Sequence, residues 1–242
     1  MKRLLYVFLS LLLTAFANIK SYSQQSQITG AWTMKAENLD HVLLFTNGHY
    51  SYSVYSVEDK KFHHTDGGIW RGDGNNRESG NLQLTTEFNT SEKSLVGKTF
   101  TCVYAIKEGR LETNITGKQL TFTRIDAGNG PLNATWRISA REQNGELYNI
   151  PPAARKTIKI LTGTRFQWAA INTETGEFFG TGGGTYSFTD GRYTEKIEFF
   201  SRDGSRVGMQ LSFEGSVKED KWQHRGKSSK GDPIYEVWTK ED

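Results

Sequence analysis

One passage of the chain occurs twice, and this repeat constrains the fold more than any other feature of the sequence. Residues 42–70 align without a gap over residues 158–186. Identical residues stand at Thr46/Thr162, Glu58/Glu174, Phe62/Phe178, Thr65/Thr181, Gly67/Gly183 and Gly68/Gly184. Aromatic residues face each other at Tyr50/Phe166, Tyr52/Trp168 and Trp70/Tyr186. Because runs and turns follow in the same order in both passages, the repeat indicates two copies of one small domain.

The first 23 residues have the pattern of a secretory signal peptide. Lys2 and Arg3 precede an apolar run from Leu4 to Ala17, and the small residues Ser21 and Ser23 stand where a signal peptidase reads them. The alternative is a membrane anchor, but a span needs about 20 apolar residues. We expect cleavage before Gln24 and a product in the periplasm or outside the cell, with no membrane span after cleavage.

The charge of the chain argues against a nucleic-acid partner. The leader holds three of the 30 basic residues and none of the 27 acidic ones, so the remainder carries equal numbers of both. No basic block is left to bind phosphate backbones. Cys102 is the single cysteine of the chain, so an intramolecular disulfide is impossible and each domain must be held by its apolar core.

Apolar and polar residues alternate along most of the chain, as Phe166 and Trp168 do with Gln167 and Ala169. This period of two predicts antiparallel strands with one buried face, and pairs such as Asp190-Gly191 predict the tight turns between them. We therefore expect an all-β fold of two tandem antiparallel β-barrels of about eight strands each, since closure removes exposed sheet edges. Glycines and a proline in residues 127–131 separate the expected domains, residues 24–127 and 131–242.

The second copy has an insertion, Gly145 to Lys156, between its first two strands. Such a connection either covers one mouth of a small barrel or forms a plain surface loop. The sequence leaves both alternatives open.

The opening of the first copy, Gly30-Ala31-Trp32, followed by a chain of hairpins, resembles the lipocalin-like (calycin) barrels. The resemblance implies that a basic residue of the last strand packs on the tryptophan ring at the closed end, and Arg124 is in the right place for Trp32. The second copy has Trp136 but Ala134 in place of the glycine, and it offers Lys240 as the basic residue.

The second copy also resembles exported lipocalin-like domains of Gram-negative bacteria over about 100 residues. The resemblance implies a fold and a compartment. No activity is assigned to that group, so it transfers no functional residue. The segments that carry it are Lys159–Leu161, Arg165–Trp168, Gly180–Tyr186, Tyr193–Glu198, Asp220–His224 and Tyr235–Thr239.

Two motifs with a superficial likeness to known sites have simpler explanations. Gly182, Gly183 and Gly184 lack the following helix that a phosphate loop needs, so they predict a barrel corner or a bulge. His63 and His64 are adjacent in a predicted strand and point to opposite faces, so they cannot share one metal ion. We expect no metal, no cofactor and no catalytic residue.

The candidate ligand-binding residues all belong to the second copy. Small residues and large rings alternate there on one predicted face, which leaves room for a ligand, whereas larger residues such as Val54 and Trp70 predict a fuller first barrel with a mainly structural role. Glu195 is a polar anchor if it faces inward and an ordinary solvated acid if it faces outward; the alternation does not decide. The predicted ligand-binding residues are Phe166, Trp168, Ala170, Tyr186 and Glu195.

Three functions remain open. The first is a non-catalytic binding protein that holds a small apolar or amphipathic ligand in a barrel cavity. The second is an envelope protein-interaction module with packed barrels and an exposed apolar patch near Pro151 and Pro152. The third is an isomerase or hydrolase in a barrel mouth, which would need Glu195 beside another titratable group, with His224 as the candidate.

Overall fold

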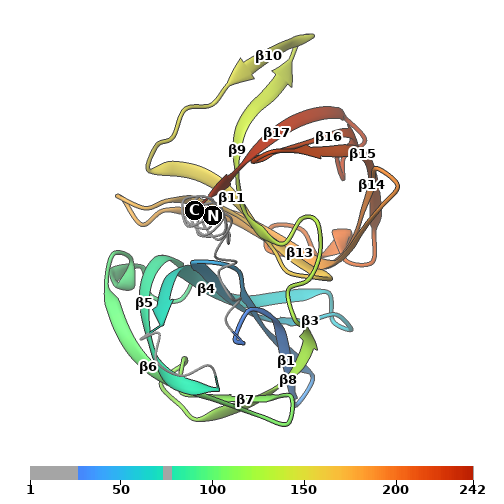
Figure 1. The fold of residues 1–242 in the computed structure, drawn as a ribbon. Coiled ribbons are helices and arrows are strands. Elements are labelled where there is room, and N and C mark those ends of the chain that lie inside the picture. Colours follow the sequence, from blue (N-terminus) through green and yellow to red (C-terminus); the bar gives the residue numbers. More distant parts are fainter. Residues whose placement is uncertain (1–26, 73–77, 242) are drawn as a thin grey trace, which may run out of the picture.

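The computed structural model describes residues 27–72 and 78–241, and in them it confirms an all-β chain with two closed barrels in tandem (Figure 1). The predicted signal peptide lies outside the described residues. The first barrel consists of β1 (Gly30–Ala36), β2 (Leu39–Phe45), β3 (His49–Ser56), β4 (Lys61–Gly72), β5 (Ser79–Asn89), β6 (Thr99–Lys107), β7 (Arg110–Thr113) and β8 (Leu120–Asp126). Each strand pairs antiparallel with the next, and β1 pairs with β8 to close the barrel.

The second barrel closes through the pairing of its first strand, β9, with its last strand, β17. Its strands are β9 (Ala134–Gln143), β11 (Arg155–Leu161), β12 (Arg165–Asn172), β13 (Phe178–Thr189), β14 (Arg192–Phe200), β15 (Gln210–Lys218), β16 (Lys221–Lys227) and β17 (Pro233–Glu241). The insertion forms a further short strand, β10 (Glu146–Asn149), which pairs only with β9. Short 3-10 helices occupy the equivalent β5–β6 and β14–β15 connections, at Lys93–Leu95 and Gly204–Arg206.

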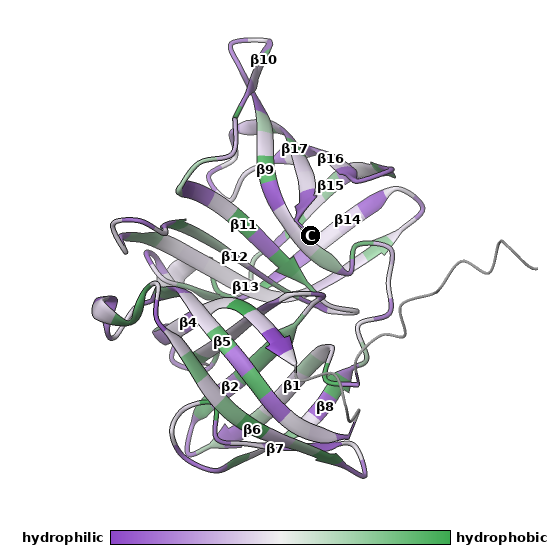
Figure 2. Ribbon diagram, turned by 60° about the vertical axis from the view of Figure 1, so that its left-hand side comes forward, coloured by the Kyte–Doolittle hydropathy of each residue, from purple (hydrophilic) through white to green (hydrophobic). Residues whose placement is uncertain are grey.

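The repeat corresponds to three successive strands in each barrel, β2-β3-β4 and β11-β12-β13. Figure 2 shows apolar and polar residues following one another along the strands of both barrels, as the alternation predicts. In each barrel the inward face forms a separate apolar core. No helix among residues 27–72 and 78–241 has the length and apolar character needed to span a membrane.

The glycine pair of the repeat produces the same bulge in both barrels. Gly67 lies opposite Phe88 and Gly68 opposite Thr86, so Glu87 is the extra residue of β5. A Cβ on Gly68 would lie 2.1 Å from the carbonyl oxygen of Thr85, so no larger residue fits there. Gly183 and Gly184 make the equivalent bulge with β14, where Glu198 is the extra residue. Of the two alternatives predicted for Gly182–Gly184, a barrel corner or a bulge, the structure has the bulge.

Each bulge turns a glutamate and a phenylalanine toward the other barrel. Phe88 and Phe199 both belong to a third apolar cluster, which contains residues of β2, β3, β5, β11, β12 and β14. Glu87 accepts a hydrogen bond from Lys156 at 2.8 Å, and Glu198 accepts one from the hydroxyl of Tyr55 at 2.8 Å. The two barrels therefore pack through equivalent faces, and the repeated passages supply much of that interface together with β5 and β14.

The strand β3 is buried along its whole length because both of its faces are covered. Tyr52 faces its own barrel core, whereas the hydroxyl of Ser53 donates to Gln167 of the second barrel at 2.9 Å. Asp126, at the end of β8, accepts backbone N–H bonds from Gly163 at 2.9 Å and Thr164 at 3.0 Å. Polar contacts thus connect the two barrels as well as apolar ones.

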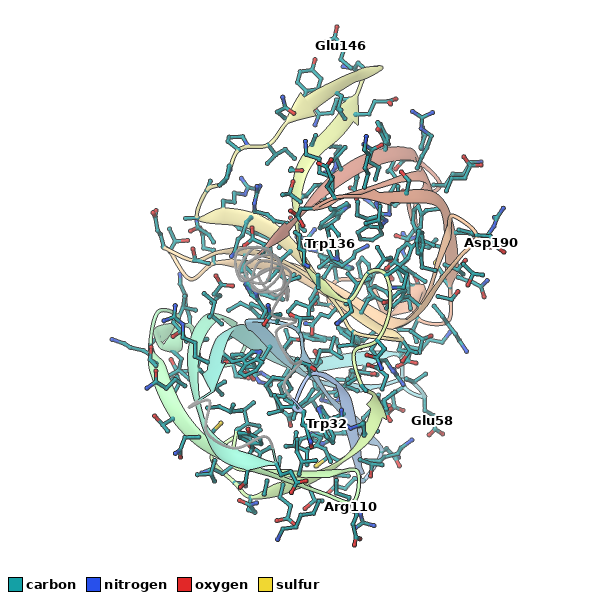
Figure 3. The ribbon with its side chains drawn as sticks, in the orientation of Figure 1. Trp32, Glu58, Arg110, Trp136, Glu146 and Asp190 are labelled. Atoms are coloured by element: carbon teal, nitrogen blue, oxygen red, sulfur yellow. The ribbon has the colours of Figure 1, made fainter. Side chains whose placement is uncertain are left out.

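Trp32 and Trp136, on the opening strands, lie in the cores of the two barrels (Figure 3). The guanidinium of Arg124 stacks over Trp32, 3.9 Å from its ring centre, as the lipocalin-like pattern implies. The indole N–H groups donate to Ile28 in one barrel and to Leu132 in the other, both at 2.8 Å. Trp136 packs edge-on against Trp222, with ring centres 5.9 Å apart.

Candidate functional site

The second barrel encloses a cavity of about 350 Å³ that opens between its connecting loops. Arg202 and Ser228 line it from the β14–β15 and β16–β17 connections, which mark the open end. Its walls are mainly apolar, with Trp168, Ile197 and Phe213 among them. A volume of this size falls within the range of small-molecule sites.

A buried ion pair connects two of the strands that line this cavity. The ammonium Nζ of Lys159 on β11 lies 2.7 Å from Oε1 of Glu195 on β14, and both side chains are less than a tenth exposed. The hydroxyl of Tyr193 also donates to Glu195, at 2.7 Å. Glu195 therefore faces inward, which decides between the two orientations that the sequence left open.

Aromatic rings surround the ammonium of Lys159. Its Nζ lies between 5.2 and 5.7 Å from the centres of the rings of Phe166, Tyr193, Trp222 and Trp238. The negative faces of these rings attract the cation, and Glu195 supplies the compensating charge. Because desolvation of an ion is costly without a partner, the pair and its rings form one unit.

A second charged group contains His224, Glu236 and Arg141. Nε2 of His224 lies 2.9 Å from Glu236, whose carboxylate also accepts two hydrogen bonds from Arg141, at 2.6 and 3.0 Å. Burial lowers the pKa of His224, and the hydrogen bond to Glu236 opposes this only in part. Burial alone would raise the pKa of Glu236, but the hydrogen bond from His224 and the charge of Arg141 lower it to about 2.

These shifts define how the dyad is protonated near neutral pH. His224 is neutral, and its tautomer with the proton on Nε2 donates to the ionised carboxylate of Glu236, whereas the indole N–H of Trp238, 3.3 Å from the same Nε2, would need the other tautomer. Its Nδ1 then carries a lone pair, and this atom has no hydrogen-bond partner among the described residues. An imidazole oriented by a carboxylate in this way can accept a proton.

Four of the five predicted ligand-binding residues line the cavity: Phe166, Trp168, Ala170 and Glu195. Tyr186 does not; it lies in the core at the closed end, where its hydroxyl donates to the carbonyl of Thr162 at 2.5 Å. Its partner in the repeat, Trp70, donates to the carbonyl of Thr46 in the first barrel at 2.9 Å. These two rings therefore plug equivalent closed ends, which explains why Tyr186 cannot line the open cavity.

Sequence reasoning missed Lys159, Glu236 and Arg141 as members of the site. The sequence did mark Lys159 as unusual, because it is the single charged residue in the apolar run Ile158–Leu161. Its neighbours Ile158 and Ile160 face the interface between the barrels, so Lys159 faces the other way. Glu236 carries a similar signal between Tyr235 and Val237. A charge in a strongly apolar strand indicates a buried partner, although the sequence does not say which one.

The first barrel holds a cavity of about 550 Å³, so the expectation that it is the fuller barrel is wrong. Trp70 was expected to fill it, but the ring lies at the closed end. Tyr50, Tyr52 and Cys102 line the cavity together with the His64–Asp66 pair. His63, by contrast, is exposed, as expected for adjacent residues of a strand.

The insertion in the second copy forms a hairpin that projects from the barrel, with Glu146 near its tip (Figure 3). Leu147 and Tyr148 are both nearly half exposed on this hairpin. The tip of the insertion is thus a surface feature, whereas Ile150 at its base packs against the core of the second barrel.

No model of a known family matches the chain, and no curated protein matches it either. Within the described residues, no three His, Cys, Asp or Glu side chains come together in a way that could hold a metal ion. The geometry of the cavities therefore carries the functional argument.

Proposed function

We propose that the protein is an exported, lipocalin-like binding protein that holds one small amphipathic ligand in the cavity of its second barrel. The observation that carries this proposal is the cavity of about 350 Å³, whose apolar walls surround a few polar groups. A site of this composition buries the apolar body of a ligand and orients it by its polar end. The apolar leader of residues 1–23 and the Trp32–Arg124 contact support the export and the lipocalin-like assignment.

The charges of the cavity favour a ligand with an acidic group. Glu195 pairs with Lys159, and Glu236 pairs with Arg141. Arg202, on the exposed rim of the cavity, contacts the backbone carbonyl of Phe179, and no ion pair of Arg202 is found among the described residues. A ligand carboxylate at the mouth would pair with Arg202 while its apolar part contacts Trp168 inside.

Isothermal calorimetry with three naphthalene probes tests the proposal. The probes share one ring system and differ in charge: 1-naphthaleneacetate, 1-naphthalenemethanol and 1-naphthylmethylamine. We expect Trp168→Ala to weaken 1-naphthaleneacetate binding at least tenfold, and Arg202→Gln to weaken it severalfold. Arg192→Gln, an exposed arginine of β14 outside the cavity, is the matched control and should leave binding unchanged. Absence of binding by the folded wild-type protein, or equal binding by all variants, would contradict the proposal.

An enzyme of the barrel mouth is the second candidate, and the buried dyad of His224 and Glu236 favours it. The inward Glu195 does lie within hydrogen-bond reach of a titratable group, although that group is Lys159 rather than His224. A neutral histidine oriented by a carboxylate could act as the general base that takes a proton from a water molecule as the water attacks a bound ester. Hydrolysis of p-nitrophenyl butyrate above the buffer rate, lost in His224→Asn and kept in Arg192→Gln, would favour this candidate over simple binding.

The interaction-module alternative has less support. It requires packed barrels, whereas both barrels hold cavities. Its remaining support is the hairpin with Leu147 and Tyr148, next to the predicted patch at Pro151 and Pro152.

A further inference from the structure

From the first barrel we infer a second ligand site, one that takes a small aromatic or amphipathic amine. This site goes beyond the function proposed above, which concerns the second barrel alone. The cavity of about 550 Å³ is the larger of the two, and its wall combines aromatic rings with a carboxylate.

Asp66 provides the charge of this site. It lies on β4 with its side chain directed into the first barrel, where it lines the cavity beside Tyr50 and Tyr52. The residues described as lining this cavity include one carboxylate and neither lysine nor arginine. In the second barrel, by contrast, Lys159 and Arg141 neutralise both carboxylates.

His64, beside Asp66, can make all of its hydrogen bonds as a neutral imidazole. Nε2 of His64 lies 2.9 Å from Oδ1 of Asp66, and Nδ1 of His64 lies 2.7 Å from the hydroxyl of Ser91. A neutral imidazole satisfies both contacts, since it donates from Nε2 and accepts at Nδ1. The contacts of His64 therefore do not require an imidazolium, which would neutralise Asp66 inside the partly apolar cavity.

The tyrosines beside it stay uncharged. Burial and the charge of Asp66 raise the pKa of Tyr52 to about 12, and the same two causes raise the pKa of Tyr50. The hydroxyl of Tyr52 is engaged with Nδ1 of His41 at 2.6 Å, so its ring face rather than its oxygen is offered to a ligand. Neutral phenol rings next to a carboxylate match an ammonium group, because the rings attract a cation and the carboxylate forms a charge-assisted hydrogen bond with it.

The remaining wall suits the apolar part of such a ligand. Val54, Leu84 and Phe100 line the same cavity, and Asn114 adds an amide near the β7–β8 connection. The volume lies in the middle of the range for small-molecule sites, so a ring system with an aminomethyl side chain fits. A ligand carboxylate would instead meet Asp66 without a compensating cation, which disfavours acids.

Calorimetry on the whole chain tests this inference with the same three naphthalene probes. We expect 1-naphthylmethylamine to bind at least tenfold more tightly to the wild type than 1-naphthalenemethanol at a site that Asp66→Asn removes. The asparagine keeps the size of the side chain and removes its charge. Asp59→Asn, in the surface turn after β3, is the matched control and should bind the amine as the wild type does.

Two further variants keep the result interpretable. His64→Gln retains the carboxylate and should retain amine binding, which shows that the charge rather than the imidazole matters. Trp168→Ala should weaken the acidic probe in the second barrel and leave the amine unaffected, so failure of one site can be told from failure of the other. Equal affinity of the amine and the alcohol for the wild type, undiminished amine binding in Asp66→Asn, or loss of amine binding in Trp168→Ala would each overturn the inference. The comparison of amine and alcohol needs no variant, so it stands even if Asp66→Asn does not fold.

Discussion

The buried pair of Lys159 and Glu195 makes the sharpest prediction about the second barrel. Glu195→Gln keeps the shape of the side chain, and its amide oxygen can still accept the hydroxyl of Tyr193. The ammonium of Lys159, which is about 6% exposed, then loses its only carboxylate within 4 Å among the described residues. Removal of one partner from such a pair costs about 3–5 kcal/mol, because a buried charge is left without compensation.

The reverse substitution, Lys159→Met, should cost a similar amount because it leaves Glu195 with the hydroxyl of Tyr193 alone. The double variant should recover most of the loss, because it removes both charges and keeps the volume. Its free energy of unfolding should lie within about 1–2 kcal/mol of that of the wild type. In a chain of this length, about 3–5 kcal/mol corresponds to a fall in Tm of roughly 6–20 °C. Urea denaturation of the four proteins, followed by tryptophan fluorescence, measures the coupling.

Additive losses of unfolding free energy in this double-mutant cycle would refute the reasoning. If each single variant costs less than about 1 kcal/mol and the double variant costs their sum, water screens the pair and the cavity wall is not a low-dielectric environment. The rings around Lys159 would then be core packing without an electrostatic role.

Three further predictions concern packing, pH and the bulge. Trp136→Ala should lower the free energy of unfolding by about 3–5 kcal/mol because its ring is fully buried. Trp168→Ala should lower it by only about 1–2 kcal/mol, because one side of that ring already faces the cavity. Thermal melts that show equal losses would mean that Trp168 is core packing. Burial holds the pKa of His224 below 6.5, so the unfolded chain binds a proton that the native state does not, and the free energy of unfolding should fall by up to about 1.4 kcal/mol per pH unit as pH drops below 6.5. Urea titrations at pH 7 and pH 5 should show a smaller fall for His224→Asn, and an equal fall would show that His224 titrates normally. Gly184→Ala should cost about 3 kcal/mol or more because its Cβ would lie 2.1 Å from the carbonyl of Lys196, whereas Gly208→Ala, with φ +92° and open space, should cost about 1–2 kcal/mol by calorimetric melting, and equal costs would remove the steric argument.

Much of the architecture could be predicted because it depends on local pattern. The alternation of Phe166 and Trp168 with their neighbours identifies the strands, and the repeat identifies two copies of one barrel. The resemblance of Gly30-Ala31-Trp32 to the opening of lipocalin-like barrels implied the contact of Arg124 with Trp32, which the structure contains. Gly182, Gly183 and Gly184 predicted a barrel corner or a bulge, and the structure has a bulge at Gly183 and Gly184 because glycine permits close backbone approach.

The face that each strand presents could not be predicted in the same way. A period of two says that Glu195 and Lys196 point in opposite directions, but it does not say which of them points inward. The alternation of β3 suggested one solvated face at Ser51 and Ser53, yet both faces are buried because the second barrel covers the serines. The alternation of polar and apolar residues in a strand is the same whether its polar face meets water or a second domain.

Strand period, turn chemistry and glycine geometry act between near neighbours, so the sequence alone predicts two β-barrels, a corner or bulge at Gly182–Gly184 and the tryptophans of the opening strands. The folded chain is needed to see that both barrels are hollow, that Lys159 meets Glu195, and that Asp66 lies in a cavity whose described lining residues include neither lysine nor arginine. The volume of a cavity and the charge within it depend on side chains from all eight strands of a barrel, which meet only when the barrel closes.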